Sequence, residues 1–544
     1  MASPASVPAL LETLLGEDDS DGQDTALLPY IQALQRWKVW RDNVPLFYSS
    51  CVQCTNEWPS LTVQLFPHIT PDPHTPDLQR HAVLYGNKQG DDDATVIVMA
   101  SFAVFESGAR QPLPSRLSDE TAPVLDIATY AHPAGDVDRL RYCPSRPELL
   151  AAKCAGAALS LYDVGSVTLA RPKSDRPAAA ERAVEDAAGA AGAGMEVEEE
   201  GEEGGGGGGS LLCGGPVSTL KSAAQEDVSL AWGDSGGGGG LRLFSGVLGG
   251  GIGEYAVRED GSLAEVTVRR GGHDGDASVV DLAWGAAGAA AEPSGGAAAD
   301  AAAAAAAGPG LLASCGTDGR TVLWDPRQRP PALQAPRCRQ DVNGVGFSPV
   351  AGGSLLATAG NDGIVRVYDV RQLGGSAAGT SASTSSAAAA AAPQALHRLK
   401  GHCCAVRQVS FNPYGNGGGG GGPLLASADE QGRVLLWQLG RSEALEEGLA
   451  TRPELLFAHA GHVLPVDDFS WSTVLYGTLA SVAGFLDPEV VAAARAYPGA
   501  EPDLPQPPPA VQVWRPAADV LPPPPAAAVA THRSRARAAM SSSP

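Results

Sequence analysis

Two stretches of the chain align without a gap: LLASCGTDGRTVLWDPR at 311–327 and LLATAGNDGIVRVYDVR at 355–371. A third copy, LLASADEQGRVLLWQLG, occupies 424–440. Each copy begins with small and apolar residues, passes through a polar turn that contains glycine, and ends in alternating apolar residues with an aromatic side chain. Alternating apolar residues on both sides of such a turn are typical of paired β-strands. The repeat therefore predicts an all-β framework.

The spacing of the repeat indicates which β-fold to expect. Trp324 and Tyr368, near the ends of the first two copies, lie 44 residues apart, and Gly-His pairs stand at 272–273, 401–402 and 461–462. A period of 40–45 residues with Gly-His and Trp-Asp landmarks is the signature of WD repeats, in which each repeat supplies one four-stranded blade of a propeller.

Weaker copies of the repeat bring the number of blades to seven. They lie at 81–105, 136–164, 228–257 and 467–516. We therefore predict an all-β, seven-bladed WD-repeat β-propeller with an N-terminal amphipathic helix and long disordered loop insertions. Because a propeller must leave no open sheet edge, we expect SLTVQLF (60–66) to pair with the last blade and close the ring.

Composition limits the classes of partner. The 544 residues carry a formal net charge of −23, which argues against direct nucleic-acid binding and favours basic protein partners. The nine cysteines form no even ladder, so we expect reduced thiols and an intracellular compartment. No stretch has the length and apolar bulk of a membrane span, and the N-terminus lacks the basic flank of a secretory signal.

Shifts in composition suggest the domain organisation. We expect a disordered acidic N-terminus at 1–23, a helix and connector at 24–50, the propeller at 57–516, and a disordered Pro/Ala-rich basic tail at 517–544. Glycine- and alanine-rich segments bury too little apolar surface to offset the entropy of ordering the chain. We expect such low-complexity insertions near 172–216, 285–309, 373–394, 414–423 and 485–510.

The helix is predicted from IQALQRWKVWRDN at 31–43. Its spacing is amphipathic, with Trp37 and Trp40 beside a face that carries Ile31, Leu34, Lys38 and Arg41. We expect Pro45 to end it.

Two segments at the start of the propeller carry a family resemblance. RWKVWRDNVPLFYSS (36–50) and NEWPSLTVQLFPHI (56–69) resemble the opening of the retinoblastoma-binding, or multicopy-suppressor-of-IRA, family of histone chaperones. PELLFAHAGHVLPVDDFSW (453–471) is similar to that family's last blade. The resemblance implies a nuclear, and also cytoplasmic, histone-binding scaffold without catalysis or cofactor. Its implied partners are histones three and four and the subunits of chromatin assembly, histone acetyltransferase, deacetylase or polycomb complexes.

The resemblance also implies a groove for a histone helix between the N-terminal helix and an acidic loop. The positions that correspond to this groove are Ile31, Leu34, Gln35, Lys38, Glu443, Glu446, Glu447, Leu455, Leu456 and Phe457. Apolar residues beside carboxylates suit an amphipathic basic helix. By residue type alone, core leucines and a solvated glutamate loop are the favoured interpretation, and only the resemblance favours the groove. Arg452 departs from the family pattern and places a positive charge near the acidic cluster.

A second implied site, for a basic tail peptide, lies on the propeller face. Its matching positions are Asp136, Asp138, Arg139, Glu226, Asp341 and Asn343. Val228, Val280 and Ala405 stand where the family carries aromatic or acidic residues, so that about half of the site is missing. We therefore expect tail binding there to be weak or lost.

An alternative function is a substrate receptor of a cullin-type ubiquitin ligase. WDPR (324–327) and YDVR (368–371) resemble the WDxR box with which some propellers dock on the ligase adaptor, so that Arg327 and Arg371 would be the docking residues. The acidic run at 196–203 suits either histone shielding or solubility, and the basic segment 531–538 is a weak nuclear-import signal.

Enzymatic readings find little support. Cys51 and Cys54 have CxxC spacing, but no second ligand pair follows at zinc-site spacing. The glycine runs lack the Gly-Lys-Ser/Thr ending of a phosphate-binding loop. The Gly-His histidines are expected to bond within their own blades. We therefore expect no catalytic residues, no metal and no cofactor.

Overall fold

The computed structural model describes residues within 20–523. Inside this range it leaves out 56–59, 72–77, 87–94, 106–126, 133–134, 155–157, 166–210, 213–214, 222–227, 235–239, 259, 286–309, 327, 329–332, 350–353, 374–393, 417–421, 442–452, 485–487 and 497–509. Most residues of the five predicted insertions therefore lie outside the described residues, as do the acidic run at 196–203 and the basic segment at 531–538.

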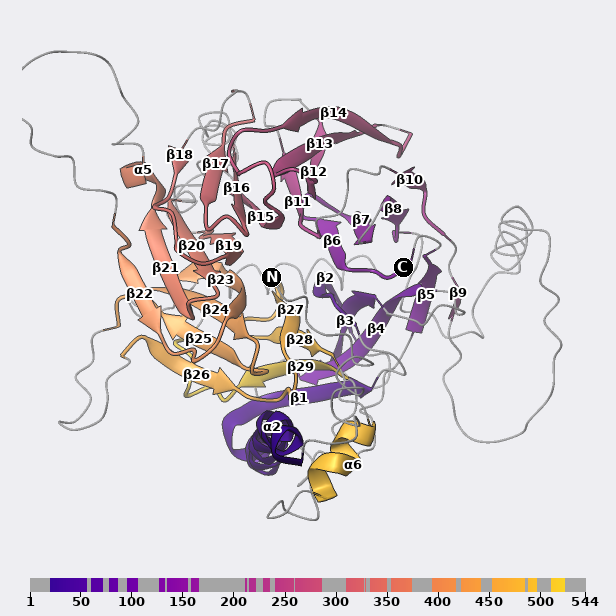
Figure 1. The fold of residues 1–544 in the computed structure, drawn as a ribbon. Coiled ribbons are helices and arrows are strands. Elements are labelled where there is room, and N and C mark those ends of the chain that lie inside the picture. Colours follow the sequence, from indigo (N-terminus) through magenta and orange to yellow (C-terminus); the bar gives the residue numbers. More distant parts are fainter. Residues whose placement is uncertain are drawn as a thin grey trace, which may run out of the picture.

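Seven sheets, antiparallel except for the short strand β9 in the first, form a ring, which confirms the predicted seven-bladed propeller (Figure 1). Blade 1 contains β2 (Val63–Pro71), β3 (Leu78–Gly86), β4 (Val96–Phe105), β5 (Ile127–Ala131) and β9 (Leu211–Leu212). Blade 2 contains β6 (Arg139–Cys143), β7 (Arg146–Cys154), β8 (Ala158–Asp163) and β10 (Ser218–Lys221). Blade 3 contains β11 (Leu230–Asp234), β12 (Leu241–Val247), β13 (Gly251–Val257) and β14 (Leu263–Arg269).

The remaining blades continue around the ring in chain order. Blade 4 contains β15 (Val279–Gly285), β16 (Leu311–Gly316), β17 (Thr321–Trp324) and β18 (Leu333–Gln334). Blade 5 contains β19 (Val342–Phe347), β20 (Leu355–Gly360), β21 (Ile364–Asp369) and β22 (His397–Lys400). Blade 6 contains β23 (Val406–Asn416), β24 (Pro423–Asp429), β25 (Val434–Gln438) and β26 (Leu455–His459). Blade 7 contains β27 (Val466–Trp471), β28 (Leu479–Ala483), β29 (Ala510–Pro516) and β1 (Tyr48–Thr55).

The Gly-His and Trp-Asp landmarks bond to one another. In blade 4, the Trp324 indole donates to Ser314 Oγ at 2.8 Å, and the same hydroxyl lies 2.8 Å from His273 Nε2. His273 Nδ1 in turn lies 3.1 Å from Asp318. Blade 6 repeats the set with Trp437, Ser427, His402 and Asp429. These buried polar groups are therefore satisfied inside the sheet, as the landmark positions predict.

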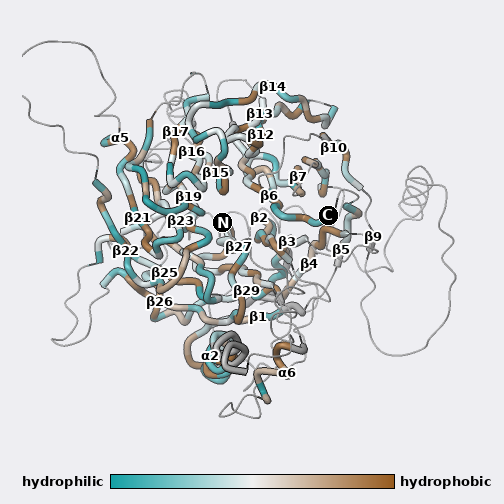
Figure 2. Tube along the Cα trace, viewed as in Figure 1, coloured by the Kyte–Doolittle hydropathy of each residue, from teal (hydrophilic) through white to brown (hydrophobic). Residues whose placement is uncertain are grey.

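Apolar side chains fill the spaces between neighbouring blades, so hydrophobic residues occur all around the ring (Figure 2). The predicted turn glycines Gly319, Gly363 and Gly432 have φ values of +73°, +71° and +76°. Only glycine adopts this conformation at no steric cost, which explains why each repeat carries one there.

The ring is closed by a strand other than the predicted one. β1, from the N-terminal side, pairs antiparallel with β29, with Val52 opposite Val513. The prediction that 60–66 closes the ring is wrong, because β2 is the innermost strand of blade 1 and pairs with β3. The helix that precedes β1 packs on blade 7 and so delivers β1, rather than β2, to that blade's outer edge.

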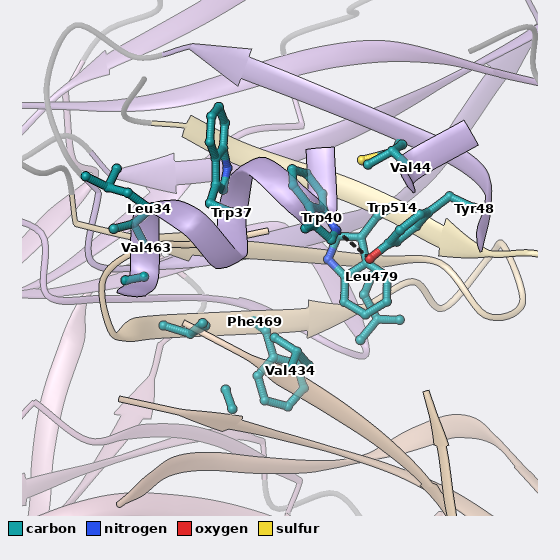
Figure 3. Close-up of a cluster of buried hydrophobic side chains, with 14 of the residues drawn as sticks. Leu34, Trp37, Trp40, Val44, Tyr48, Val434, Val463, Phe469, Leu479 and Trp514 are labelled. Atoms are coloured by element: carbon teal, nitrogen blue, oxygen red, sulfur yellow. Dashed lines mark hydrogen bonds between the residues drawn. The ribbon is translucent and has the colours of Figure 1, made fainter. Parts of the chain in front are cut away.

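This helix, α2, runs from Ser20 to Phe47 and lies outside blade 7 (Figure 1). It continues two residues past Pro45, because a proline in the last turn removes a single backbone hydrogen bond. Trp37, Trp40 and Val44 are buried in one cluster with Trp514 and Phe469 of blade 7 (Figure 3). Among the described residues, no helix combines the length and the apolar character needed to cross a membrane.

Residues 485–510 contain a helix, although this segment was predicted to be a low-complexity insertion. Helix α6 (Pro488–Ala496) interrupts the turn between β28 and β29, and its Val490, Val491 and Ala494 are buried in the same cluster as α2. A short helix, α5 (Val370–Leu373), follows β21. The predicted insertion 172–216 likewise contains a strand near its end, because β9 pairs parallel with β5.

Candidate functional site

The two apolar residues of α2 that were predicted to line a groove are buried. Leu34 is 0% exposed and Ile31 is 4% exposed, and both belong to the cluster that joins α2 to blade 7 and α6. Their apolar surface is therefore already covered by this chain. The sequence pattern alone does not show that α6 packs against α2, or which side of α2 faces the propeller. For this reason Ile31 and Leu34 were predicted to face the ligand.

A different set of apolar residues on α2 faces solvent. Val39, Leu46 and Phe47 are 63%, 60% and 51% exposed, which is unusual for large apolar side chains in one helix. Val39 and Leu46 are seven residues apart, so both lie on one side of the helix. The predicted groove did not include these residues, although the seven-residue spacing of Val39 and Leu46 is visible in the sequence. They form the apolar part of α2 that is open to a partner.

Polar side chains lie between the buried and exposed apolar residues of α2. Gln35 and Lys38, two of the predicted groove residues, are half-buried. Arg36 donates to the Gln431 carbonyl at 2.6 Å, and the Arg41 guanidinium lies 5.4 Å from the centre of the Trp37 ring. The Arg36 bond connects the helix to blade 6, whereas the Arg41 contact lies within the helix.

Strand β26 of blade 6 lies beside the end of α2. The Tyr48 ring, directly after the exposed Leu46 and Phe47, packs edge-on against Phe457 with centroids 5.2 Å apart. Leu456 and Phe457 are half-buried and pack against the α2 cluster, whereas Leu455 packs against the core between blades 5 and 6. The structure thus brings Leu456 and Phe457 next to α2. Glu443, Glu446 and Glu447 lie outside the described residues.

The predicted tail site on the propeller face is occupied by the protein's own charges. Arg139 lies 3.2 Å from Asp468 on β27, and Arg141 contacts the same carboxylate at 2.8 and 3.0 Å. Burial alone would raise the pKa of Asp468, but Arg141 and Arg139 outweigh burial and hold that pKa below its usual range. Arg139 is therefore committed to an internal ion pair.

The other predicted face residues that the structure describes are partly covered. Asn343 donates to Asn361 at 2.7 Å and to the Val406 carbonyl at 3.0 Å. Asp136, Asp138 and Asp341 are half-buried, and Glu226 lies outside the described residues. Near the same innermost strands, burial raises the pKa of Asp467 to about 6, which weakens its negative charge in mildly acidic solution.

The two arginines of the alternative ligase-docking motif differ in what the structure shows of them. Arg371 lies on α5 with 74% of its side chain exposed, and Asp369 holds its guanidinium by bonds of 2.9 and 2.7 Å. Arg327 lies outside the described residues. Among the described residues there is also no group of three or more side chains arranged to hold a metal ion.

The fold defines a class of protein, a seven-bladed WD-repeat propeller with a helix packed outside its last blade. A sequence model for the histone-binding protein RBBP4 and its counterpart in the CAF1 complex matches residues 35–104, which include the end of α2 and strands β1 to β3. A model for the "WD domain, G-beta repeat" matches residues 393–438. Over these segments the chain is similar to RBBP4- and MSI-like WD-repeat histone-binding proteins.

Individual relatives agree with this assignment. The chain is 27% identical to the WD-40 repeat-containing protein MSI3 of Arabidopsis thaliana, over 26% of this chain and 34% of the relative. It is 28% identical to the histone acetyltransferase type B subunit 2 of Schizosaccharomyces pombe, over 24% of this chain and 31% of the relative. The protein of the same name from Debaryomyces hansenii is 35% identical over 16% of this chain and 20% of the relative. The aligned part of the chain therefore spans at most about a third of these three relatives.

Proposed function

We propose that this chain binds an amphipathic basic helix of histone four, as a non-catalytic scaffold subunit of a chromatin assembly or chromatin-modifying complex in the nucleus. The observation that supports the proposal most is the exposure of the apolar residues Val39, Leu46 and Phe47 on α2, because Tyr48, which follows them, packs against Phe457 of β26. Desolvated apolar anchors carry most of the binding energy of such interfaces. The matched histone-binding sequence model includes this same part of α2.

The proposed groove differs from the one expected from sequence. Its helix wall consists of Val39, Leu46 and Phe47 in place of Ile31 and Leu34, with Gln35 and Lys38 at the polar border. Its other wall consists of Leu456 and Phe457. Glu443, Glu446 and Glu447 belong to the segment that joins blade 6 strands β25 and β26, and we propose that they attract the basic side chains of the ligand.

Calorimetric titration with a peptide of the first helix of histone four tests the proposal. The wild-type chain should bind it more tightly than a scrambled peptide of the same composition. Leu46→Asp should weaken binding about tenfold or more, because burying a leucine stabilises by about 1.5–3 kcal/mol. Val217→Asp is the matched control, since Val217 is 55% exposed on another blade. Equal binding of native and scrambled peptides would overturn the proposal.

Charge reversal in the acidic segment measures the contribution of the glutamates apart from that of the apolar residues. Glu446→Lys combined with Glu447→Lys should slow association and flatten its salt dependence, with little change in fold stability. Unchanged affinity of the double variant at low salt would show that these glutamates do not contribute to binding.

The exposed Arg371 supports a second candidate function, docking to the adaptor of a cullin-type ubiquitin ligase. Asp369 fixes the direction of this guanidinium, which a docking residue needs. Recovery of cullin components with the native protein, lost in Arg371→Ala, would support this function; recovery unaffected by the substitution would exclude Arg371 from it.

A further inference from the structure

Strand β26 contains a bulge at the point where it meets α2. Trp437 of β25 pairs with Leu455, whereas the preceding Leu436 pairs with Phe457, so that Leu456 is an extra residue in β26. In a regular strand, consecutive side chains point to opposite faces. The bulge explains why Leu456 and Phe457, although consecutive, both pack against the α2 cluster while Leu455 packs on the other side.

The residue before this bulge is bonded on three sides. The Glu454 carbonyl accepts from the Gln438 amide at 2.8 Å. Its carboxylate Oε1 accepts from the Gly440 amide at 2.9 Å and lies 2.7 Å from Nδ1 of His397. Since an ionised carboxylate only accepts hydrogen bonds, Nδ1 of His397 is the donor. Glu454 thus joins the two strands of blade 6 and connects them to β22 of blade 5.

We propose that Glu454, oriented by His397, is a positioning residue for the histone-helix groove: it holds the bulged register that turns Leu456 together with Phe457 toward α2. This inference rests on the proposed function for its ligand. Without the bulge, the consecutive side chains of Leu456 and Phe457 would point to opposite faces of the sheet. The pair suits this role because its side chains are only 27% and 21% exposed, so that solvent competes little for the bonds.

Limited trypsin digestion tests the positioning role without any ligand. Arg441 directly follows the bonded segment, and the next basic residue, Arg452, precedes Pro453, which blocks trypsin. Cleavage after Arg441 therefore reports release of this part of blade 6. Glu454→Ala and His397→Ala should each accelerate it by about tenfold relative to other sites, because local opening becomes more favourable. Glu454→Gln, which keeps an acceptor oxygen, should restore most of the protection.

The same variants are then titrated with the histone-four helix peptide. Glu454→Ala should weaken binding about five- to tenfold while the midpoint of thermal unfolding stays close to that of Glu148→Ala, a control at an exposed ion pair of blade 2. Wild-type-like cleavage in both alanine variants would overturn the inference. If the wild-type chain does not bind the peptide, the proposed function fails, and the digestion still decides whether Glu454 and His397 hold the register.

Discussion

The hydroxyl of Tyr48 lies 2.9 Å from Nδ1 of His459, and the Trp40 indole donates to the same hydroxyl at 2.7 Å. An indole can only donate, so the Tyr48 oxygen accepts from Trp40 and also bonds to His459. Burial holds the pKa of His459 well below its usual range. Its ring stacks on Trp514 with centroids 4.1 Å apart. This chain of bonds links α2, the closing strand β1 and the outer strand of blade 6.

Removal of the Tyr48 hydroxyl should therefore destabilise the fold. Tyr48→Phe leaves the Trp40 indole and His459 Nδ1 buried without their partner, at a cost of about 1–3 kcal/mol in the free energy of unfolding. Urea denaturation measures this change. Tyr476→Phe is the control, because Tyr476 makes one bond, to the Pro522 carbonyl, from a half-buried position. A larger loss in the control than in Tyr48→Phe would contradict the assigned network.

Two leucines of the same helix should behave in opposite ways. Leu34→Ala should lower the free energy of unfolding by about 2–5 kcal/mol, because it opens a cavity in the cluster between α2, blade 7 and α6. Leu46→Ala should change stability by less than about 0.5 kcal/mol, since Leu46 is exposed. Peptide titration should show the reverse order, with Leu46→Ala weakening histone-helix binding. Equal stability losses would mean that α2 is rotated from the orientation seen here.

Asp468 should be critical for closure of the ring. Its carboxylate accepts from Arg141, the Thr62 hydroxyl and the Val63 amide, and so joins blades 7, 1 and 2. Asp468→Ala leaves Arg139 and Arg141 as buried charges without their partner, with an expected loss of about 3–5 kcal/mol.

Urea denaturation of Asp468→Ala should be compared with Glu148→Ala, whose exposed ion pair should contribute less than about 1 kcal/mol. If the two variants lost the same stability, the charge network at the innermost strands would not hold the ring together.

Mild acid should destabilise the protein. Burial lowers the pKa of His81 and His132 to about 4 and that of His462 to about 3, below the usual value of 6.5. Below pH 6.5 these histidines therefore bind protons in the unfolded chain but not in the folded chain. Their contribution to the free energy of unfolding is complete above pH 6.5 and is lost as the pH falls. Each such histidine removes about 1.4 kcal/mol per pH unit within its window. Asp467, with its raised pKa, opposes the loss between about pH 6 and 4.

Urea denaturation at pH 7.5, 6.5 and 5.5 checks the sign. The free energy of unfolding should fall most between pH 6.5 and 5.5, because several histidines outweigh one aspartate. His462→Gln should reduce the steepness of this fall whatever its effect on stability at pH 7.5. A free energy of unfolding that rises from pH 6.5 to 5.5 would contradict the assigned burial of these histidines.

Local pattern alone was enough to predict the propeller. Each repeat, such as 311–327 and 355–371, carries its own strands, its turn glycine and an aromatic residue near its end. Because a blade is built mainly from contacts within one repeat and with its neighbours, the repeat period and landmarks are sufficient to count the blades. The amphipathic spacing at 31–43 was likewise enough to predict the helix.

The groove depended on contacts between distant parts of the chain. Which face of α2 is covered was decided by blade 7 and by α6, more than 400 residues away, so that Leu34 is buried and Leu46 is exposed. The orientation of Leu456 was decided by a bulge, whose position follows from pairing with β25 and cannot be read from β26 alone. Closure by β1 instead of 60–66 has the same origin, because either segment can form a strand and only the assembled ring selects the one whose edge meets β29.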